Sequence, residues 1–376
     1  MLPIKRLLYL QLYQAETLIS NSKKFSFSDK QKDQYLKSLV ELFYAIKASI
    51  ENGLDDAKIY EKKNHLDFIF KSIEFLKDST LNTIPFEVVG CLDKAMSDWI
   101  EPDKFIIVTS LQNNLYSFSY DLSYAKNDIF YQSLLTEYGI SFTRKLVQIN
   151  LPLNLSKDYL SSVALYHELG HFVDLQYSIT KAVAYAIFKK TLNVSDELCD
   201  FMPLLKEADL DFSKLSYHLG EYFCDLFAAQ YIGESLGLFL QYITGNSTIE
   251  SLTHPATTTR VKVISDFVNG VSNPVVNYLQ GALQALIGKQ FTISFDKITS
   301  DDFYKLIPYD VQNDRELHGS IVYGWEVWLA DSQKFNEGMK YNVNLPEETI
   351  YRVINNLVEK TIGNYFTVQN WKKSKE

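Results

Sequence analysis

The sequence His167-Glu168-Leu169-Gly170-His171, inside the run SSVALYHELGHFVDLQ, constrains this chain more than any other feature. The run is expected to form a helix, which places His167 and His171 one turn apart on a single face. Both imidazoles can then reach one metal ion, while Glu168 points to the open side of that ion. The pattern therefore predicts the zinc centre of a hydrolase.

Two further features of this run indicate how the expected helix packs. Leu165, Leu169 and Phe172 recur at intervals of four and three residues and form an apolar stripe away from the histidines. Gly170 lets another backbone approach the helix closely. We therefore expect one face of the helix to be buried and the other to line a cleft.

Composition favours a globular protein that has no nucleic-acid partner. The chain has 376 residues, 46% of them hydrophobic and 14% aromatic, which is enough to bury a large core. A net charge of -9 argues against a nucleic-acid-binding surface. The three cysteines lack the spacing of a metal site and fit a reducing compartment, so a cytoplasmic protein is expected. No segment reaches the roughly 20 uninterrupted apolar residues of a membrane span.

Hydrophobic patterns predict an α+β fold that is mainly helical. Residues 1–80 read as three helices. β-rich runs are expected next, at 84–92, in a hairpin over 104–121 that turns at Asn113-Asn114, and at 143–153 before the metal helix. An edge of this sheet, in the hairpin or in the strand 144–151, is expected to hold an extended peptide against the metal.

The rest of the chain reads as mostly helical. Residues 176–216 hold a helical stretch and an acidic segment, which is either a solvated surface excursion or a lid or inhibitory element. Further expected elements are helices over about 214–243, 256–269 and 274–288, a short strand over 290–295, a Tyr/Trp-rich segment around 318–328 and a terminal helix from Pro346.

A hydrolytic zinc needs a third protein ligand, and the run YHLGEYFCDLFAA offers one. Glu221 and Asp225 are spaced by one helical turn. Glu221 completes a site of two histidines and one glutamate, and Asp225 accepts the Nδ1 proton of a ligand histidine. His218, on the same face as Glu221, and Asp225 itself remain alternative ligands.

His254 and Arg260, in the run SLTHPATTTRVKV, are candidates for stabilising an oxyanion. The metal stabilises the oxyanion of a tetrahedral intermediate only in part, so a nearby imidazole or guanidinium is useful. The alternative is that both residues merely cap and anchor a helix. Tyr323 is a further candidate oxyanion donor, whereas His65 and His318 lie far from the motifs and are expected to have ordinary roles.

The three motifs HELGH, EYFCD with FAA behind it, and THPATTTR resemble the gluzincin metallopeptidases, especially the CAAX prenyl endopeptidases and HtpX-type proteases. The block around Glu221 is also similar to the ImmA/IrrE-type peptidases. The resemblance covers about residues 155–270. It implies that His167, His171 and Glu221 bind zinc and that Glu168 is the catalytic base. It also implies that Asp225 supports a ligand and that His254 and Arg260 contact the oxyanion or the substrate. This chain lacks the transmembrane helices of the membrane-bound members and carries an insert at residues 172–220, so substrate assignments do not transfer.

These observations imply three parts: an N-terminal helical region over 1–80, a zincin-like metallopeptidase core over 81–270 and an α-rich extension over 271–376 packed on that core. The expected function is a zinc endopeptidase that acts on peptide or protein substrates. One alternative is a regulatory or binding protein on a zincin scaffold, autoinhibited or activated by a partner. Another is a structural zinc site closed by a fourth protein ligand such as His218.

Overall fold

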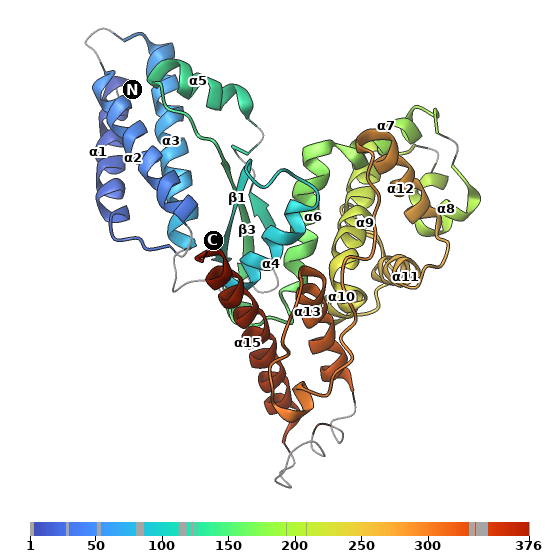
Figure 1. Ribbon diagram of the computed structural model, residues 1–376. Coiled ribbons are helices and arrows are strands. Elements are labelled where there is room, and N and C mark those ends of the chain that lie inside the picture. Colours follow the sequence, from blue (N-terminus) through green and yellow to red (C-terminus); the bar gives the residue numbers. More distant parts are fainter. Residues whose placement is uncertain are drawn as a thin grey trace. The chain divides into compact units, whose positions relative to one another are not determined.

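The structure is a computed structural model that describes residues 4–27, 30–50, 54–79, 86–112, 119–121, 124–125, 127–192, 194–207, 209–330, 335 and 345–375. Most of these residues are helical and one small sheet is present, so the α+β, mainly helical fold is confirmed (Figure 1). The chain forms two compact units. The N-terminal unit comprises Met1–Val89 and Ile100–Lys157, and the C-terminal unit comprises Gly90–Trp99 and Asp158–Glu376.

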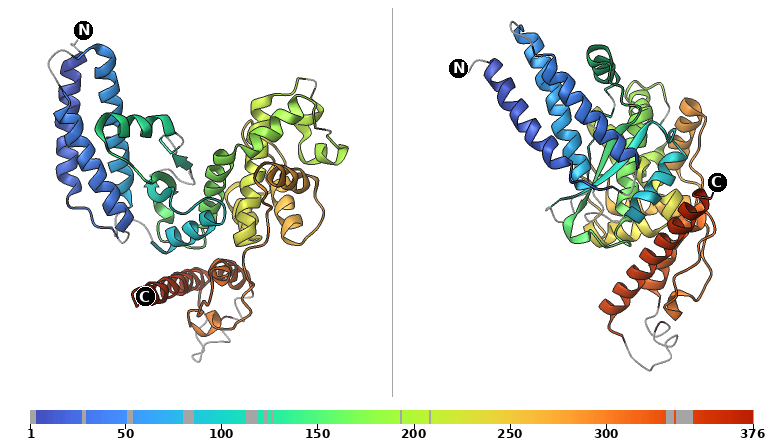
Figure 2. Two further views of the ribbon diagram at one scale, coloured as in Figure 1. Left: turned by 45° about the horizontal axis from the view of Figure 1, so that its top comes forward. Right: turned by 60° about the vertical axis from the view of Figure 1, so that its left-hand side comes forward.

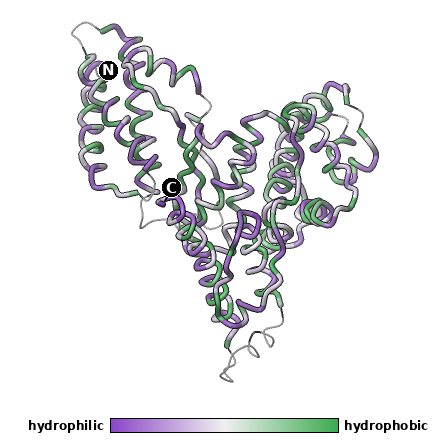
Figure 3. The backbone as a smooth tube through the Cα atoms, in the orientation of Figure 1, coloured by the Kyte–Doolittle hydropathy of each residue, from purple (hydrophilic) through white to green (hydrophobic). Residues whose placement is uncertain are grey.

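The N-terminal unit begins with three helices, as predicted: α1 (Ile4–Ser22), α2 (Lys30–Ala48) and α3 (Asp56–Asp78). The three helices contact one another and lie side by side (Figure 2). Hydrophobic and hydrophilic residues alternate along each of them (Figure 3), because each helix turns one apolar side toward the shared core.

The sheet of the N-terminal unit has three strands, β1 (Phe105–Gln112), β2 (Ser119–Asp121) and β3 (Lys145–Pro152). β3 lies in the middle, parallel to β1 and antiparallel to β2. The predicted hairpin over 104–121 is therefore wrong, since β1 and β2 are not neighbours; the expected turn at Asn113-Asn114 lies outside the described residues. β3 is buried on both faces, including its polar residues Gln148 and Asn150, as is typical of a central strand.

Helices cover this sheet within its own unit. α3 contacts β1 and β3, and Ile106, Val108 and Leu146 join the hydrophobic core of α1–α3. α5 (Asp128–Tyr138) packs on α2, and a short 3-10 turn, η1 (Leu153–Leu155), follows β3. The sheet thus belongs with the N-terminal helices, whereas the sequence placed it with the metal helix in one core over 81–270. A strand edge that holds a peptide against the metal stays a prediction.

The strand expected over 84–92 is wrong, because this segment enters α4 (Phe86–Ser97). The buried side chains of α4 are Val88, Cys91, Leu92, Ala95 and Met96. Their spacing of three and four residues is the period of a helix, not the alternation of a strand.

α9 (Phe212–Ile232) is the central helix of the C-terminal unit. Every residue from His218 to Ile232 is buried, since helices surround α9. Asp211 caps its first turn by accepting hydrogen bonds from the backbone N–H groups of Ser213 and Lys214. The helices that contact α9 are α6 (Val163–Tyr177), α7 (Ile179–Phe188), α10 (Ser235–Thr244), α11 (Thr257–Val268), α12 (Pro274–Ile287) and α13 (Asp314–Leu329).

The remaining helix predictions are largely confirmed. The helix expected over 214–243 is divided into α9 and α10 at Gly233, whose φ is 56°. α11 and α12 match the helices expected at 256–269 and 274–288, the Tyr/Trp-rich segment forms α13, and α15 (Glu347–Lys373) starts directly after Pro346. A 3-10 turn, η3 (Phe303–Lys305), precedes α13.

The strand expected over 290–295 is absent from the described structure. The side chain of Gln280 donates to the backbone oxygen of Phe291 at 2.9 Å and accepts from its backbone nitrogen at 2.8 Å. These side-chain bonds satisfy the backbone groups of Phe291 in place of a partner strand.

The acidic segment forms α8 (Asp196–Phe201) and a 3-10 turn, η2 (Pro203–Lys206). Its apolar side chains, Leu198, Met202 and Leu204, are buried. Its carboxylates are all exposed: Asp196, Glu197, Asp200, Glu207, Asp209 and Asp211. This arrangement favours a solvated surface over an inhibitory element.

Candidate metal centre

The site is built where α6 and α9 pack against each other. A Cβ atom added to Gly170 of α6 would lie 2.9 Å from the Cα of Cys224 on α9, so only glycine permits this approach. The expected close backbone contact at Gly170 is therefore confirmed. Residues 163–170 and 172–174 are all buried, so α6 is enclosed on most sides, and the cleft expected along its second face stays a prediction.

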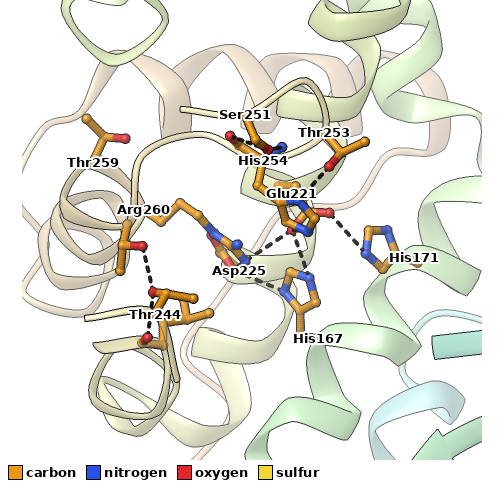
Figure 4. A network of polar contacts seen from close by, with 12 residues as sticks. His167, His171, Glu221, Asp225, Thr244, Ser251, Thr253, His254, Thr259 and Arg260 are labelled. Carbon is orange, nitrogen blue, oxygen red and sulfur yellow. Dashed lines mark hydrogen bonds and ion pairs between the residues drawn. The ribbon is translucent and has the colours of Figure 1, made fainter. Parts of the chain in front are cut away.

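His167 and His171 of α6 converge on Glu221 of α9 (Figure 4). His167 Nε2 lies 3.3 Å from Glu221 Oε2, and His171 Nε2 lies 3.5 Å from Glu221 Oε1. Two ligands bound tetrahedrally at about 2.1 Å from one ion are about 3.4 Å apart. The two contacts go to different oxygens of Glu221, so its carboxylate lies between the two imidazoles, and each separation is close to that of two donors on one ion.

An orphaned polar atom supports the same conclusion. Glu221 Oε2 is buried and accepts no hydrogen bond of normal geometry from the described residues. Its nearest cationic groups, Arg260 Nη2 at 3.2 Å and His167 Nε2 at 3.3 Å, form ion-pair contacts with it but no hydrogen bond of normal geometry, so its hydrogen-bonding capacity is unfilled. The two imidazoles and this carboxylate therefore fit a divalent cation such as zinc.

Asp225 and Arg260 form a buried ion pair behind the three candidate ligands. Arg260 donates from Nε to Asp225 Oδ2 at 2.8 Å and from Nη2 to Asp225 Oδ1 at 2.7 Å. Asp225 Oδ1 lies 3.1 Å from His167 Nδ1, and Arg260 Nη2 lies 3.2 Å from Glu221 Oε2. Asp225 thus lies on the Nδ1 side of His167 at ion-pair distance, and the hydrogen bond expected from Nδ1 to Asp225 stays a prediction. The contacts of Arg260 favour the anchoring alternative over an oxyanion contact.

His254 lies at the mouth of the site. Its Nε2 is 3.7 Å from Glu221 Oε2, its side chain is 56% exposed, and its Nδ1 is 2.7 Å from the hydroxyl of Thr253. The structure therefore brings His254 to the metal centre and leaves its imidazole accessible to a substrate from solvent.

Glu168 is buried on α6 next to the first histidine. Burial raises the pKa of Glu168 to about 7, and the positive charge of His167 counters part of this effect. A carboxyl group whose pKa lies near neutrality can both accept and return a proton.

The pKa values of the two histidines are shifted in opposite directions. Burial lowers the pKa of His167, but contacts with Asp225 and Glu221 outweigh it and raise that pKa to about 10. Burial, together with the charge of His167, lowers the pKa of His171 to about 4. Burial raises the pKa of Glu221, but the charges of Arg260 and His167 lower it well below its usual range. Protonated His167 thus balances the charge of Glu221, a role that a metal cation can take over.

His218 is not a ligand in this arrangement. Its imidazole is fully buried, and Nε2 donates to the backbone oxygen of Ser251 at 2.9 Å. Burial lowers the pKa of His218. The residue therefore fastens the segment before His254 to α9, which is the commoner role of a buried histidine.

Cys224 is the residue near the metal centre that the sequence did not indicate. Its sulfur lies within 4.8 Å of ring nitrogens of His167 and His171, which makes a second donor set of two histidines and one cysteine. We prefer Glu221 as the ligand because its carboxylate, ionised at neutral pH, lies 3.3 and 3.5 Å from Nε2 of His167 and of His171. The signal in the sequence was the three-residue spacing of Glu221 and Cys224, which places both near one face of α9.

Three residues with expected ordinary or secondary roles lie in other networks. His65 contacts the hydroxyl of Tyr138 at 2.8 Å, and the neighbouring Glu137 is already paired with Lys62 at 2.9 Å. His318 contacts the Tyr166 hydroxyl at 2.9 Å. Tyr323 donates to the backbone oxygen of Ser300 at 2.6 Å, which commits its proton to that contact and not to an oxyanion.

No family model, curated protein or solved structure matches this chain. The likeness to gluzincin peptidases therefore remains a prediction carried by the motifs. In the part of the chain that the structure describes, every helix is too short or too polar to cross a membrane.

Proposed function

We propose that this chain is a zinc-dependent endopeptidase with a gluzincin-type centre. The observation that carries the proposal is the convergence of His167 and His171 on Glu221, with separations of 3.3 and 3.5 Å. Two imidazoles and one carboxylate are the ligand set of catalytic zinc in several peptidases. When bound, zinc supplies a Lewis acid and lowers the pKa of a water molecule to about 7.

The protein's own residues divide the remaining work. Glu168 accepts a proton from the attacking water and returns it to the leaving amine, a transfer that a pKa near neutrality favours. His254, which is exposed at the mouth of the site, donates a hydrogen bond to the developing oxyanion.

Asp225 and Arg260 are positioning residues. Asp225 holds the ring of His167 from its Nδ1 side, and Arg260 holds both Asp225 and Glu221. Since Asp225 and Arg260 are themselves buried, two of the three candidate ligands, His167 and Glu221, are positioned before a metal arrives.

In this proposal the substrate is a peptide or protein. The metal centre belongs to a zincin-like core, and the protein is cytoplasmic. Support for the compartment comes from three buried cysteines that form no disulfide among the described residues, Cys91, Cys199 and Cys224. A regulatory partner belongs to the alternative function, a zincin scaffold that binds without turnover.

Glu168→Gln tests the proposal. This variant should keep one equivalent of zinc and lose at least about a hundredfold in cleavage of a fluorogenic peptide library, because its side chain can no longer accept a proton. Glu197→Gln changes an exposed carboxylate of α8 and should cleave as the wild type does. Unimpaired cleavage by Glu168→Gln contradicts the mechanism, and a wild-type protein with zinc but no turnover favours the binding alternative.

A further inference from the structure

A second polar site lies in the C-terminal unit, on the other side of α9. A cavity of about 480 Å³ is lined, among others, by residues of α4 and of the two positions after it, by Gln230 and Tyr231 of α9, by Lys289, and by three residues of α13: Lys94, Ser97, Asp98, Trp99, Asp314, Arg315 and His318. Gln230 follows Glu221 by nine positions, which places the two residues about 180° apart around the helix. The cavity is thus separate from the metal centre and has a volume typical of small-molecule sites.

One residue that lines the cavity, Gln230, carries a buried donor without a hydrogen bond. Gln230 is 2% exposed, and its Nε2 makes no hydrogen bond among the described residues. Its backbone oxygen accepts from Ser294 N at 2.6 Å, so the main chain is anchored without the amide side chain. An unsatisfied buried amide is unfavourable and indicates an acceptor that arrives from outside.

The charges around the cavity favour an anionic ligand as that acceptor. Lys289 donates to the backbone oxygen of Asp98 and lies over the Trp99 ring, but it forms no ion pair with any carboxylate in the described parts of the chain. The carboxylates of the cavity are already engaged. Asp98 accepts from the Tyr231 hydroxyl at 3.0 Å, and Asp314 pairs with Lys94 at 3.0 Å.

We propose that this cavity binds a small oxyanion, the phosphate or carboxylate group of a polar molecule, between the Gln230 amide and the Lys289 ammonium. Both groups are donors, and phosphate and carboxylate oxygens are acceptors that ammonium groups bind strongly. The indole of Trp99 provides an apolar wall for the rest of such a molecule. This site does not depend on the function proposed for the metal centre.

Binding is tested on the full chain with inorganic phosphate and, separately, with succinate. Isothermal titration is run at constant ionic strength with sodium chloride as the reference salt. Wild-type protein should bind at least one of the two probes, and the probe that binds identifies the headgroup. Gln230→Leu and Lys289→Met should each weaken binding about tenfold or more. Lys206→Met removes an exposed charge away from the cavity and should bind as the wild type does.

A thermal readout separates a ligand site from a merely structural glutamine. Without ligand, Gln230→Leu should melt at the wild-type temperature or above it, because it removes an unsatisfied donor. The binding probe should raise the melting temperature of the wild type but not that of the variant. Absence of binding of both probes, or unchanged binding in both variants, would overturn the proposal.

Discussion

Replacing Arg260 with methionine is the perturbation that best probes the support of the metal centre. In the wild type, two short hydrogen bonds from Arg260 compensate Asp225, which is fully buried, and a third contact reaches Glu221. Methionine keeps much of the side-chain volume and removes the charge. Two carboxylates then remain buried with less compensation.

The expected cost follows from that burial. Removing one partner of a buried ion pair typically costs about 3–5 kcal/mol, because the other charge stays in the interior. We therefore expect Arg260→Met to lower the free energy of unfolding by about 3–5 kcal/mol in the zinc-free protein. Lys262→Met is the matched control on the same helix: Lys262 is 61% exposed, and its pair with Asp266 should contribute less than about 1 kcal/mol.

Urea unfolding followed by tryptophan fluorescence provides the assay. All four tryptophans belong to the C-terminal unit, so the signal reports on the unit that holds Arg260. Adding Asp225→Leu to Arg260→Met should recover part of the loss, with a coupling free energy of at least about 2 kcal/mol. A loss below about 1 kcal/mol for Arg260→Met, or additive effects in the double variant, would refute the reasoning.

Two further predictions concern packing and pH. Gly170→Ala should destabilise the protein by about 1–3 kcal/mol, because its new methyl group meets the α9 backbone. In the control variant Gly281→Ala on α12, the new methyl group meets nothing within 4 Å, so this variant should be neutral or stabilised by up to about 1 kcal/mol. Equal effects of the two substitutions in urea unfolding would contradict the close approach of α6 and α9. Burial lowers the pKa of His318 from 6.5 to about 4. As the pH falls, this histidine is therefore protonated in the unfolded chain before it is protonated in the folded protein. His318 should thus lower the free energy of unfolding by about 3 kcal/mol between pH 7 and pH 4. His318→Gln should abolish that part of the pH dependence, and parallel curves for variant and wild type would speak against it.

Local patterns were sufficient to predict much of this fold. The i, i+3, i+4 spacing of apolar residues predicted α1–α3, α11 and α12, and Pro346 marked the start of α15. The same reasoning failed at 84–92, where Val88 and Val89 suggested a strand although the buried positions follow a helical period. It also failed for the sheet order, because the pairing of β1 with β3 is set by contacts between distant segments.

The candidate site, too, could be predicted only in part from local patterns. His167, His171, Glu221 and Asp225 could be selected from spacing alone, since one helical turn fixes which side chains share a face. The engagement of Arg260 by Asp225, and the burial of Cys224 beside the histidines, arise from the packing of α9 against α11 and α6, which no local pattern encodes.

X-ray absorption at the zinc edge of the purified protein tests the central claim most directly. We predict one zinc per chain with two imidazole nitrogens and carboxylate oxygen at about 2.0–2.2 Å, and loss of zinc in Glu221→Ala. A sulfur neighbour at about 2.3 Å would instead assign Cys224 as a ligand. Unchanged zinc content in Glu221→Ala, or no zinc in the wild type, would contradict the site described for His167, His171 and Glu221.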